Sequence, residues 1–336
     1  MELLIISAVI SFLGTLIITP YFIKFLQAAG IVGIDQHKKG KPSLPTSGGI
    51  CVAFGVLAGL LSYIGIQTFV FGLQTTSIQL LAVISSVLIV AFVGLTDDLN
   101  VKSKLTRTKD GFERRVGIPQ WLKPLLTLLA AIPLMVILAG DTNMTVPLVG
   151  EVNFGILYPI ILIPIGFVGA TNAINLLGGF NGAEAGMGFV YFSSLGLYGL
   201  LHGSIGSVIF LISAASVLAF LKFNWFPSKI LPGDSLTYLL GSLLAAGVIV
   251  GNMEKVGVIV LTPFIIEFFL KARAKFKASC CGKLRQDGKL DPPYGKKVYS
   301  LTHVIMNLGK FTEKQVVMIL ILIQIVFAII PFLNII

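Results

Sequence analysis

The sequence contains few charged residues and few cysteines. Of its 336 residues only 12% are charged, against roughly 25% in a typical soluble domain, and three are cysteines. A disordered chain would be rich in charge and poor in apolar residues, and a disulfide-rich secreted domain would carry many more cysteines. Both classes are therefore excluded, and no internal repeat or low-complexity segment is visible.

Apolar side chains dominate instead, at 55% of all residues and a mean hydropathy of +0.93. A helix that crosses the hydrocarbon core of a bilayer needs about 20 such residues, so the chain has room for about ten crossings. We predict an all-α integral membrane protein that forms a single polytopic membrane domain over residues 1–336. The apolar stretches are 3–26, 48–66, 78–96, 121–140, 154–172, 187–201, 205–221, 235–251, 256–274 and 314–336.

The distribution of positive charge predicts the orientation. With the N-terminus outside, and counting adjoining helix ends, the inner side holds 24 of the 25 Lys and Arg residues, Lys255 being the exception. Cationic loops stay in the cytoplasm, so we predict that both termini lie outside and that the active site faces the cytoplasm. The same rule explains the net charge of +10 without nucleic acid as a partner. The predicted inner, active-site segments are 27–47, 97–123, 173–186, 222–234 and 275–313.

The acidic residues direct attention to this inner face. Eleven of the fifteen Asp and Glu residues fall on the inner side or at inner helix ends, whereas ion-coupled transporters carry ionisable groups near the middle of the membrane. Asp97 and Asp98 end the third apolar stretch, and Lys102 follows. Adjacent carboxylates are costly to desolvate unless a divalent metal or a basic partner compensates their charge. The alternative interpretation is a pair of solvated acids at a helix end.

The run from Asn172 to Gly186 follows the fifth apolar stretch directly. Asn172 and Asn175 are three residues apart and share one face if the helix continues. Asparagine supplies a neutral oxygen for Mg²⁺, or donor and acceptor groups for a nucleobase, and glycines let a ligand approach the backbone. A plain turn would explain the glycines of this run but not its three asparagines.

Two further inner segments carry candidates. The segment 224–234 places Gly-Asp at the start of the eighth stretch, where an acid can also serve simply as a helix cap. The basic loop 275–313 contains His303, and topology alone explains most of its lysines. Lys123, by contrast, stands at the start of the fourth stretch beside Trp121 and Pro124.

Together these motifs resemble the polyprenyl-phosphate N-acetylhexosamine-1-phosphate transferases over nearly the whole chain. The resemblance is most specific at 172–186 and 224–234, and it is closer to the archaeal and eukaryotic dolichyl-phosphate branch than to the bacterial peptidoglycan enzyme. It implies transfer of N-acetylglucosamine-1-phosphate, or a related sugar phosphate, from UDP-N-acetylglucosamine to a polyprenyl or dolichyl phosphate. UMP would be released, with Mg²⁺ as cofactor and Mn²⁺ as a substitute.

The resemblance also implies roles for individual residues. Asp97 and Asp98 match paired aspartates beside the acceptor phosphate, and Lys123 matches a lysine that grips the diphosphate. Asn175 and Asp234 match ligands of the catalytic Mg²⁺. Gly179 and Asn181 belong to the turn that receives the uridine, and the full set of expected substrate contacts is Lys102, Asn172, Gly179, Asn181, Glu184, Leu231 and His303.

Two departures from the family pattern affect substrate recognition. Leu231 occupies a position where an aromatic residue commonly stacks on uracil, so stacking should be weaker or come from elsewhere. The last inner loop lacks both the bacterial histidine triplet and the eukaryotic His-Arg-x-Pro pattern, and only His303 is near the expected place. That loop shapes sugar recognition in the family, so N-acetylglucosamine is an expectation drawn from the resemblance.

Other functions stay open at this point. Within the family, the alternative is a bacterial-type phospho-N-acetylmuramoyl-pentapeptide transferase or another UDP-sugar transferase. A multi-span transporter is disfavoured because neither a midspan polar site nor an inverted repeat is visible. The sequence leaves open the length of the lipid acceptor and whether the protein forms a homodimer.

Overall fold

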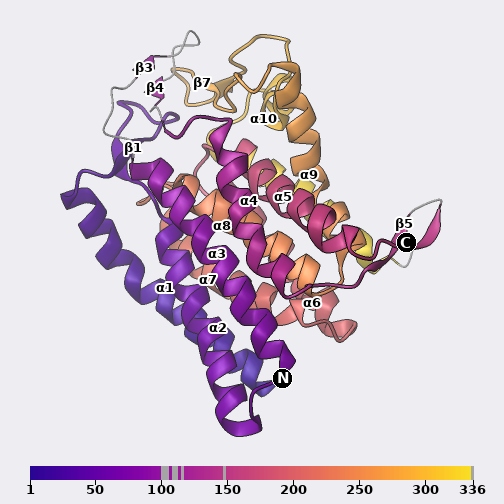
Figure 1. The fold of residues 1–336 in the computed structure, drawn as a ribbon. Coiled ribbons are helices and arrows are strands. Elements are labelled where there is room, and N and C mark those ends of the chain that lie inside the picture. Colours follow the sequence, from indigo (N-terminus) through magenta and orange to yellow (C-terminus); the bar gives the residue numbers. More distant parts are fainter. Residues whose placement is uncertain (100–105, 108–112, 115–116, 147–148, 334–336) are drawn as a thin grey trace.

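Helices make up the body of the protein (Figure 1). The computed structural model describes residues 1–99, 106–107, 113–114, 117–146 and 149–333. A π-helical turn, Tyr158–Leu162, leads into α5, and a 3₁₀ turn, Ile330–Phe332, follows α11. The α-helices are α1 (Glu2–Ala28), α2 (Gly49–Phe71), α3 (Thr75–Leu99), α4 (Leu122–Val136), α5 (Ile163–Leu176), α6 (Ala183–Leu201), α7 (Gly206–Asn224), α8 (Gly233–Val250), α9 (Glu254–Arg273), α10 (Leu301–Leu308) and α11 (Glu313–Ile329).

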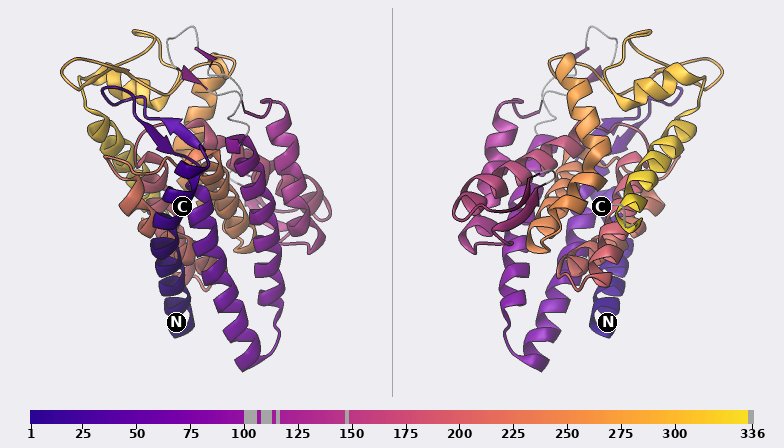
Figure 2. Two further views of the ribbon diagram at one scale, coloured as in Figure 1. Left: turned by 90° about the vertical axis from the view of Figure 1, so that its left-hand side faces the viewer. Right: turned by 90° about the vertical axis from the view of Figure 1, so that its right-hand side faces the viewer.

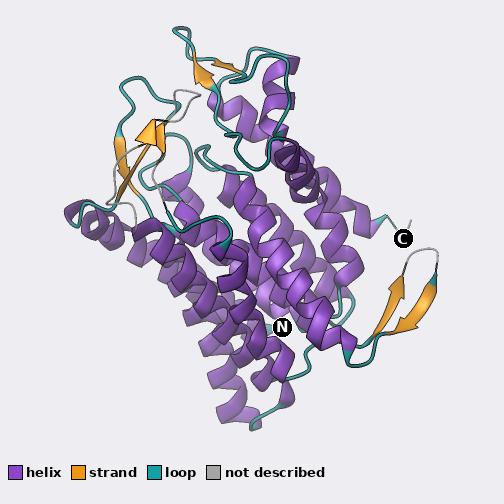
Figure 3. Ribbon diagram, turned by 45° about the horizontal axis from the view of Figure 1, so that its top comes forward, coloured by secondary structure: helices purple, strands orange, loops and turns teal. Residues whose placement is uncertain are grey.

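Short antiparallel hairpins lie in the connections between helices, as the orange strands of Figure 3 show. Three of the hairpins and α10 gather at one end of the bundle, at the top of Figure 1. The N-terminus lies toward the opposite end (Figure 2). The strand pairs are β1 (Val32–Ile34) with β2 (Ser43–Pro45), β3 (Thr106–Arg107) with β4 (Glu113–Arg114), β5 (Asn143–Val146) with β6 (Gly150–Asn153), and β7 (Lys283–Leu284) with β8 (Leu290–Asp291).

Within the described residues, seven helices are long and apolar enough to cross a membrane. Helix α4 is apolar but has only 15 residues, and α6 and α9 do not belong to the seven. These seven helices support the predicted polytopic membrane protein. Their number is smaller than the predicted count of about ten crossings. The seven spans are Glu2–Ala28, Gly49–Phe71, Thr75–Leu99, Tyr158–Leu176, Gly206–Asn224, Gly233–Val250 and Glu313–Phe332.

Helix α1 shows a polarity that suits lipid and not water. Its buried face includes Ser7, Ser11, Thr15 and Thr19 at four-residue spacing, whereas large apolar side chains such as Ile17 are exposed. The Ser11 hydroxyl donates to the Ile212 carbonyl at 2.9 Å. Small polar residues at helix contacts and apolar residues outward are typical of helices packed within a bilayer.

The helices begin and end some residues away from the predicted limits of the spans. Several predicted site residues therefore lie inside helices and not in the segments between them. Asp97 and Asp98 lie inside the last turn of α3, Asn172 and Asn175 both lie in α5, and Glu184 lies in the first turn of α6. The apolar stretch ends before the helix does. The helix can continue because the polar residues at its end find hydrogen-bond partners on neighbouring segments. The hairpin β7–β8 and α10, both within 275–313, were not predicted.

Close backbone contact fixes the start of α8 against α3. A Cβ on Gly94 would lie 2.7 Å from the Ser235 Cα and 2.8 Å from the Asp234 carbonyl oxygen, so only glycine fits there. Gly233, which precedes Asp234, has a φ of +70°, a conformation that side-chain-bearing residues rarely adopt. The position of Asp234 therefore depends on two glycines from different helices.

We expect Gly94→Ala to destabilise the detergent-solubilised protein by about 1–3 kcal/mol, because the added methyl group meets backbone atoms that cannot move aside. The measurement is the thermal unfolding midpoint. Gly169→Ala in α5 is the matched control, since nothing lies within 4 Å of its added Cβ, and it should be neutral or slightly stabilising. Equal effects of the two substitutions would contradict the close-contact argument.

Candidate active site

A cavity of about 480 Å³ collects side chains from inner segments that are far apart in the sequence. Its walls come from the β1–β2 connection, the ends of α3, α5 and α9, the starts of α4 and α8, the turn before α6, and residues 276–281. The structure thus brings most of the predicted site residues into one place. Those that line the cavity are Asp97, Asp98, Lys123, Asn175, Gly179, Asn181, Glu184, Leu231 and Asp234.

The paired aspartates have different partners. Asp97 accepts hydrogen bonds from the Ile118 N–H and from the Lys123 amine, the latter at 2.6 Å. Asp98 accepts from the backbone N–H groups of Asp234 at 2.8 Å and of Ser235 at 3.1 Å. A carboxylate at these orphan amides acts as a cap at the start of α8. Asp98 therefore holds α8 in place, while Asp97 holds Lys123.

Lys123 joins α3 to α8 through its side chain. Its Nζ lies 2.6 Å from Asp97 Oδ2 and 2.8 Å from Asp234 Oδ2, and the residue is only 6% exposed. The charge-assisted hydrogen bonds fix the amine in the cavity wall. Such a buried ammonium can stabilise negative charge that develops on a bound phosphate.

The two asparagines of α5 occupy different surroundings. Asn175 Nδ2 lies 3.5 Å from Asp234 Oδ2, and its Oδ1 accepts from the Thr237 hydroxyl at 2.7 Å. Asn172 points elsewhere, because its Nδ2 donates to the Thr127 hydroxyl and to the Val168 carbonyl. Asn172 does not belong to the lining of the cavity.

The donor set suits a hard divalent cation. Three carboxylates from Asp97, Asp98 and Asp234 stand in the wall with the amine of Lys123 bonded to two of them. The amide of Asn175 also lines the cavity, with its nitrogen toward Asp234 and its oxygen toward the Thr237 hydroxyl, and Mg²⁺ prefers carboxylate and amide oxygens as ligands. Among the described residues, no three His, Cys, Asp or Glu side chains are arranged to hold a metal by themselves. A Mg²⁺ ion held by one or two protein oxygens and by substrate phosphates needs no such group.

The turn before α6 forms another wall of the cavity. Gly179 has a φ of +93°, and its N–H donates to Glu184 Oε1 at 2.7 Å. The other oxygen of Glu184 is buried without a hydrogen-bond partner. Asn181 is 3% exposed, and its backbone and side chain both donate to carboxylates, of Glu313 and Asp35 respectively. The turn is therefore held from several sides.

Leu231 lines the cavity where α8 approaches the β1–β2 hairpin. Its N–H donates to the Pro45 carbonyl at 2.7 Å, and its side chain occupies space that a Cβ on Gly33 would need. Leu231 therefore supplies an apolar surface packed on β1.

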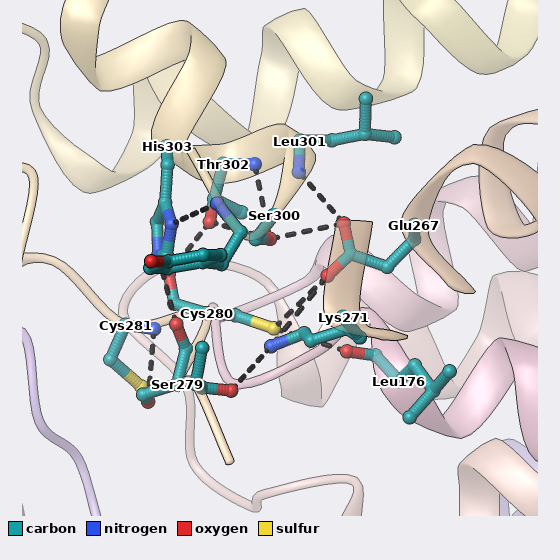
Figure 4. Close-up of polar contacts among 12 residues, drawn as sticks. Leu176, Glu267, Lys271, Ser279, Cys280, Cys281, Ser300, Leu301, Thr302 and His303 are labelled. Carbon is teal, nitrogen blue, oxygen red and sulfur yellow. Dashed lines mark hydrogen bonds and ion pairs between the residues drawn. The ribbon is translucent and has the colours of Figure 1, made fainter. Parts of the chain in front are cut away.

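His303 supports the cavity from behind. It is fully buried, its Nε2 pairs with the Ser279 carbonyl at 2.8 Å, and its Nδ1 accepts from the Tyr299 N–H (Figure 4). Burial, and then the positive charge of Lys271, lower the pKa of His303 to about 4, so the ring is neutral at physiological pH. Ser279 lines the cavity and His303 does not.

The same cluster anchors the segment after α9. Glu267, fully buried in α9, accepts from the Leu301 N–H at 2.7 Å and from the Ser300 hydroxyl at 3.1 Å (Figure 4). Lys271 donates to the Ala278 carbonyl at 2.8 Å. These contacts hold residues 278–281 against the cavity. Lys102, also predicted to contact substrate, lies outside the described residues.

Several lining residues were missed by sequence reasoning, namely Asp35, Thr237, Lys271 and Ser279. Thr237 follows Asp234 by three residues and shares its helix face, a spacing that could have revealed it. Asp35 is an acid within a basic inner segment, which is a weak signal. Lys271 and Ser279 gave none, because cations and small residues are ordinary there.

Comparison with known proteins gives a consistent picture. Residues 80–252 match the glycosyl transferase family 4 profile. A protein of Saccharolobus solfataricus, provisionally named a UDP-N-acetylglucosamine–dolichyl-phosphate N-acetylglucosaminephosphotransferase, is 35% identical over 97% of this chain and 95% of its own length. The Dictyostelium discoideum protein with that name is 28% identical, over 88% and 79%. A phospho-N-acetylmuramoyl-pentapeptide-transferase of Halalkalibacterium halodurans is also 28% identical, over 79% and 80%.

The family match covers half of the chain, and it contains the ends of α3, α5 and α8 that carry the acidic and amide groups of the cavity. The 35% identity to the archaeal relative extends over nearly the full length of both proteins. The chain therefore belongs to glycosyl transferase family 4.

Proposed function

We propose that the protein transfers N-acetylglucosamine-1-phosphate, or a related sugar phosphate, from a UDP-sugar to a polyprenyl or dolichyl phosphate and releases UMP. The observation that carries this proposal is the Asp97–Lys123–Asp234 cluster, in which Asp97 and Lys123 are buried and which shares one cavity with the turn at Gly179 and Asn181. The names of the archaeal and Dictyostelium relatives support the choice of sugar and lipid.

We further propose that the chain crosses the membrane about ten times, with α4, α6 and α9 completing the seven long apolar spans. Both termini then lie outside, and the cavity faces the cytoplasm. The bias of 24 among 25 Lys and Arg residues supports this orientation. A cytoplasmic cavity would meet the water-soluble nucleotide sugar at the surface where the lipid phosphate lies.

In this reaction Lys123 would neutralise negative charge on the diphosphate as the sugar phosphate is transferred. Phosphoryl transfer depends on positioning and on charge stabilisation more than on covalent chemistry from the protein. Asp97 would hold the Lys123 amine in place, and Asp98 would hold the start of α8. The lipid phosphate is already largely ionised near neutral pH, because its second pKa is about 6, so a strong base is not required.

Asp234 and Asn175 would hold Mg²⁺, with Mn²⁺ as a substitute. Their oxygens lie in the same wall as Lys123. When bound, the ion would supply charge neutralisation for the phosphate oxygens. Asp234 would then exchange part of its contact with Lys123 for the ion, and its helix end would stay fixed by Asp98.

The uridine would bind at the opposite wall, against Gly179, Asn181 and Glu184. The unpartnered buried oxygen of Glu184 supports this placement, since a ligand donor would satisfy it. Leu231 would supply an apolar contact in place of an aromatic stack. A direct contact from Lys102 remains a prediction, as does a homodimer, whereas Asn172 and His303 do not line the cavity.

The names of bacterial relatives indicate one alternative substrate, a UDP-N-acetylmuramoyl-pentapeptide. Proteins 27–31% identical to the chain are named phospho-N-acetylmuramoyl-pentapeptide-transferases. The relatives at 34% and 35% identity are named for N-acetylglucosamine transfer, which favours that sugar.

The purified protein should release UMP from UDP-N-acetylglucosamine only when polyprenyl phosphate and Mg²⁺ are both present. UMP release is measured over a panel that includes UDP-N-acetylmuramoyl-pentapeptide. Asp234→Asn and Asn175→Ala should each remove most turnover and regain part of it at excess Mg²⁺, because the first removes the negative charge of a ligand and the second removes a ligand from a sparse metal site. Near-normal activity of both variants at low Mg²⁺ would refute the metal assignment, and no UMP release from any UDP-sugar would refute the function.

Lys123→Ala should lower turnover by about 100-fold or more, as expected for loss of a donor that acts on transition-state charge. Lys123→Arg should keep part of the activity, because it retains the charge but changes the donor geometry. The initial rate of UMP release is measured at saturating Mg²⁺, together with the unfolding midpoint. Lys289→Ala, in the β7–β8 turn and outside the cavity lining, is the control and should be near normal. Full activity of Lys123→Ala would refute the catalytic role of Lys123 and would leave only its contribution to membrane topology.

Cysteine labelling in intact cells tests the orientation. Lys39 and Thr145 are both exposed, one in the β1–β2 connection and one in β5. A membrane-impermeant maleimide should label Thr145→Cys but not Lys39→Cys until the cells are permeabilised. Labelling of position 39 from outside would reverse the proposed topology.

A further inference from the structure

A second group of charges adjoins the cavity, and one of its members, Asp35, belongs to the cavity lining. Asp35, in the β1–β2 connection, is 5% exposed, and Glu313, in the first turn of α11, is 3% exposed. Lys38 donates to Glu313 Oε2, and its Nζ lies 3.5 Å from Asp35 Oδ2. These three residues, called the outer triad below, join two segments 275 positions apart in the sequence.

Both acids of the outer triad also hold Asn181. Glu313 Oε1 accepts from the Asn181 backbone N–H at 2.9 Å, and Asp35 Oδ2 accepts from Asn181 Nδ2 at 2.9 Å. Ionised carboxylates are acceptors only, so the amide nitrogen of Asn181 must face Asp35. The carbonyl oxygen of Asn181 is then the side-chain atom that remains to accept from a ligand. The two acids therefore determine which polar group the turn can present.

His37 ties the same turn to the segment after α9. Its ring stacks on Phe180 with 4.3 Å between centroids, and its Nε2 accepts from the Gly282 N–H at 3.1 Å. His37 Nδ1 lies 3.6 Å from Glu313 Oε1. The β1–β2 connection, the turn before α6, the start of α11 and residue 282 thus meet around one set of charges.

Burial of these charges contributes little net stability by itself. Desolvation of paired ions offsets much of their mutual attraction, and apolar replacements of buried ion groups are often neutral. Hydrogen bonds to ionised groups, in contrast, fix geometry strongly. Both carboxylates of the outer triad accept a hydrogen bond from Asn181, a residue of the cavity wall, which indicates a positioning role.

We propose that Asp35, Lys38 and Glu313 are positioning residues that set the affinity for the nucleotide portion of the substrate by orienting Asn181. The triad does not touch the reacting phosphates in this scheme, so the chemical step should be nearly unaffected by its loss. This inference rests on the proposed function, and it adds the segment around Asp35 and the start of α11 to the determinants of nucleotide binding.

The first experiment compares Asp35→Ala with wild-type protein in detergent. The dissociation constant for UMP and the KM for UDP-N-acetylglucosamine should each rise about 10-fold, as expected for loss of a hydrogen bond to a charged group, while kcat stays nearly unchanged. Asp35→Asn should show a smaller effect, because its amide oxygen can still accept from Asn181. Asp291→Ala is the matched control: it removes an acid that pairs with Arg285 and Lys310 at the surface, and it should change neither constant.

A double-mutant cycle separates positioning from direct contact. Asn181→Ala should itself weaken UMP binding, and Asp35→Ala added to it should cost little more, because Asp35 acts through the Asn181 side chain. Additive losses would show that Asp35 contacts the nucleotide independently and would overturn the proposal. A fall in kcat and in the unfolding midpoint, with the UMP dissociation constant unchanged, would also overturn it.

Hydrogen–deuterium exchange gives a readout that does not depend on turnover. In nucleotide-free protein, exchange of the peptide covering 178–182 should accelerate in Asp35→Ala and in Glu313→Ala but not in Asp291→Ala. Unchanged exchange in both triad variants would refute the positioning role. If wild-type protein neither binds UMP nor releases it from any UDP-sugar, the proposed function fails, whereas normal wild-type turnover with unaltered triad variants refutes only this inference.

Discussion

The arrangement of the cavity depends on the hydrogen bonds that Asp98 accepts from the first backbone amides of α8. They fix where one helix begins relative to the end of another, since orphan amides at a buried helix start need an acceptor. Once α8 is held there, Asp234 reaches Lys123, and Lys123 reaches Asp97. A shift of α8 would leave buried charges without partners, which is far more costly than a shift between apolar surfaces.

The backbone itself makes this contact possible. Gly94 lets α3 approach the Asp234–Ser235 peptide more closely than any other residue would allow, and Gly233 supplies the left-handed conformation that directs α8 into the contact. Close approach and polar satisfaction therefore support one another. Neither the glycine nor the aspartate would have the same effect at this position without the other.

The Lys123 and Asn181 parts of the cavity differ in how their charged groups are arranged. At the Lys123 end, carboxylates outnumber the amine bonded to them, a condition suited to a divalent cation and phosphates. At the Asn181 end, Lys38 and Glu313 lie outside the lining, and the lining itself presents backbone, amide and carboxylate groups. A nucleoside diphosphate sugar has the same asymmetry, with its charge concentrated on the diphosphate.

The class of protein and nine of the residues that line the cavity could be predicted from the amino-acid sequence alone. The lengths of the apolar stretches predicted the membrane-spanning helices. The acids and amides at the inner ends of these stretches were predicted to lie at one face of the membrane. The sequence could not separate Asp97 from Asp98, because adjacent residues carry the same chemistry until their partners are known. Only the tertiary structure decided that Asp98 caps α8, that Asn172 and His303 point away from the cavity, and that Asp35 and Glu313 meet at Asn181. The capping by Asp98 and the meeting at Asn181 depend on contacts between segments more than a hundred residues apart, and no local pattern records such contacts.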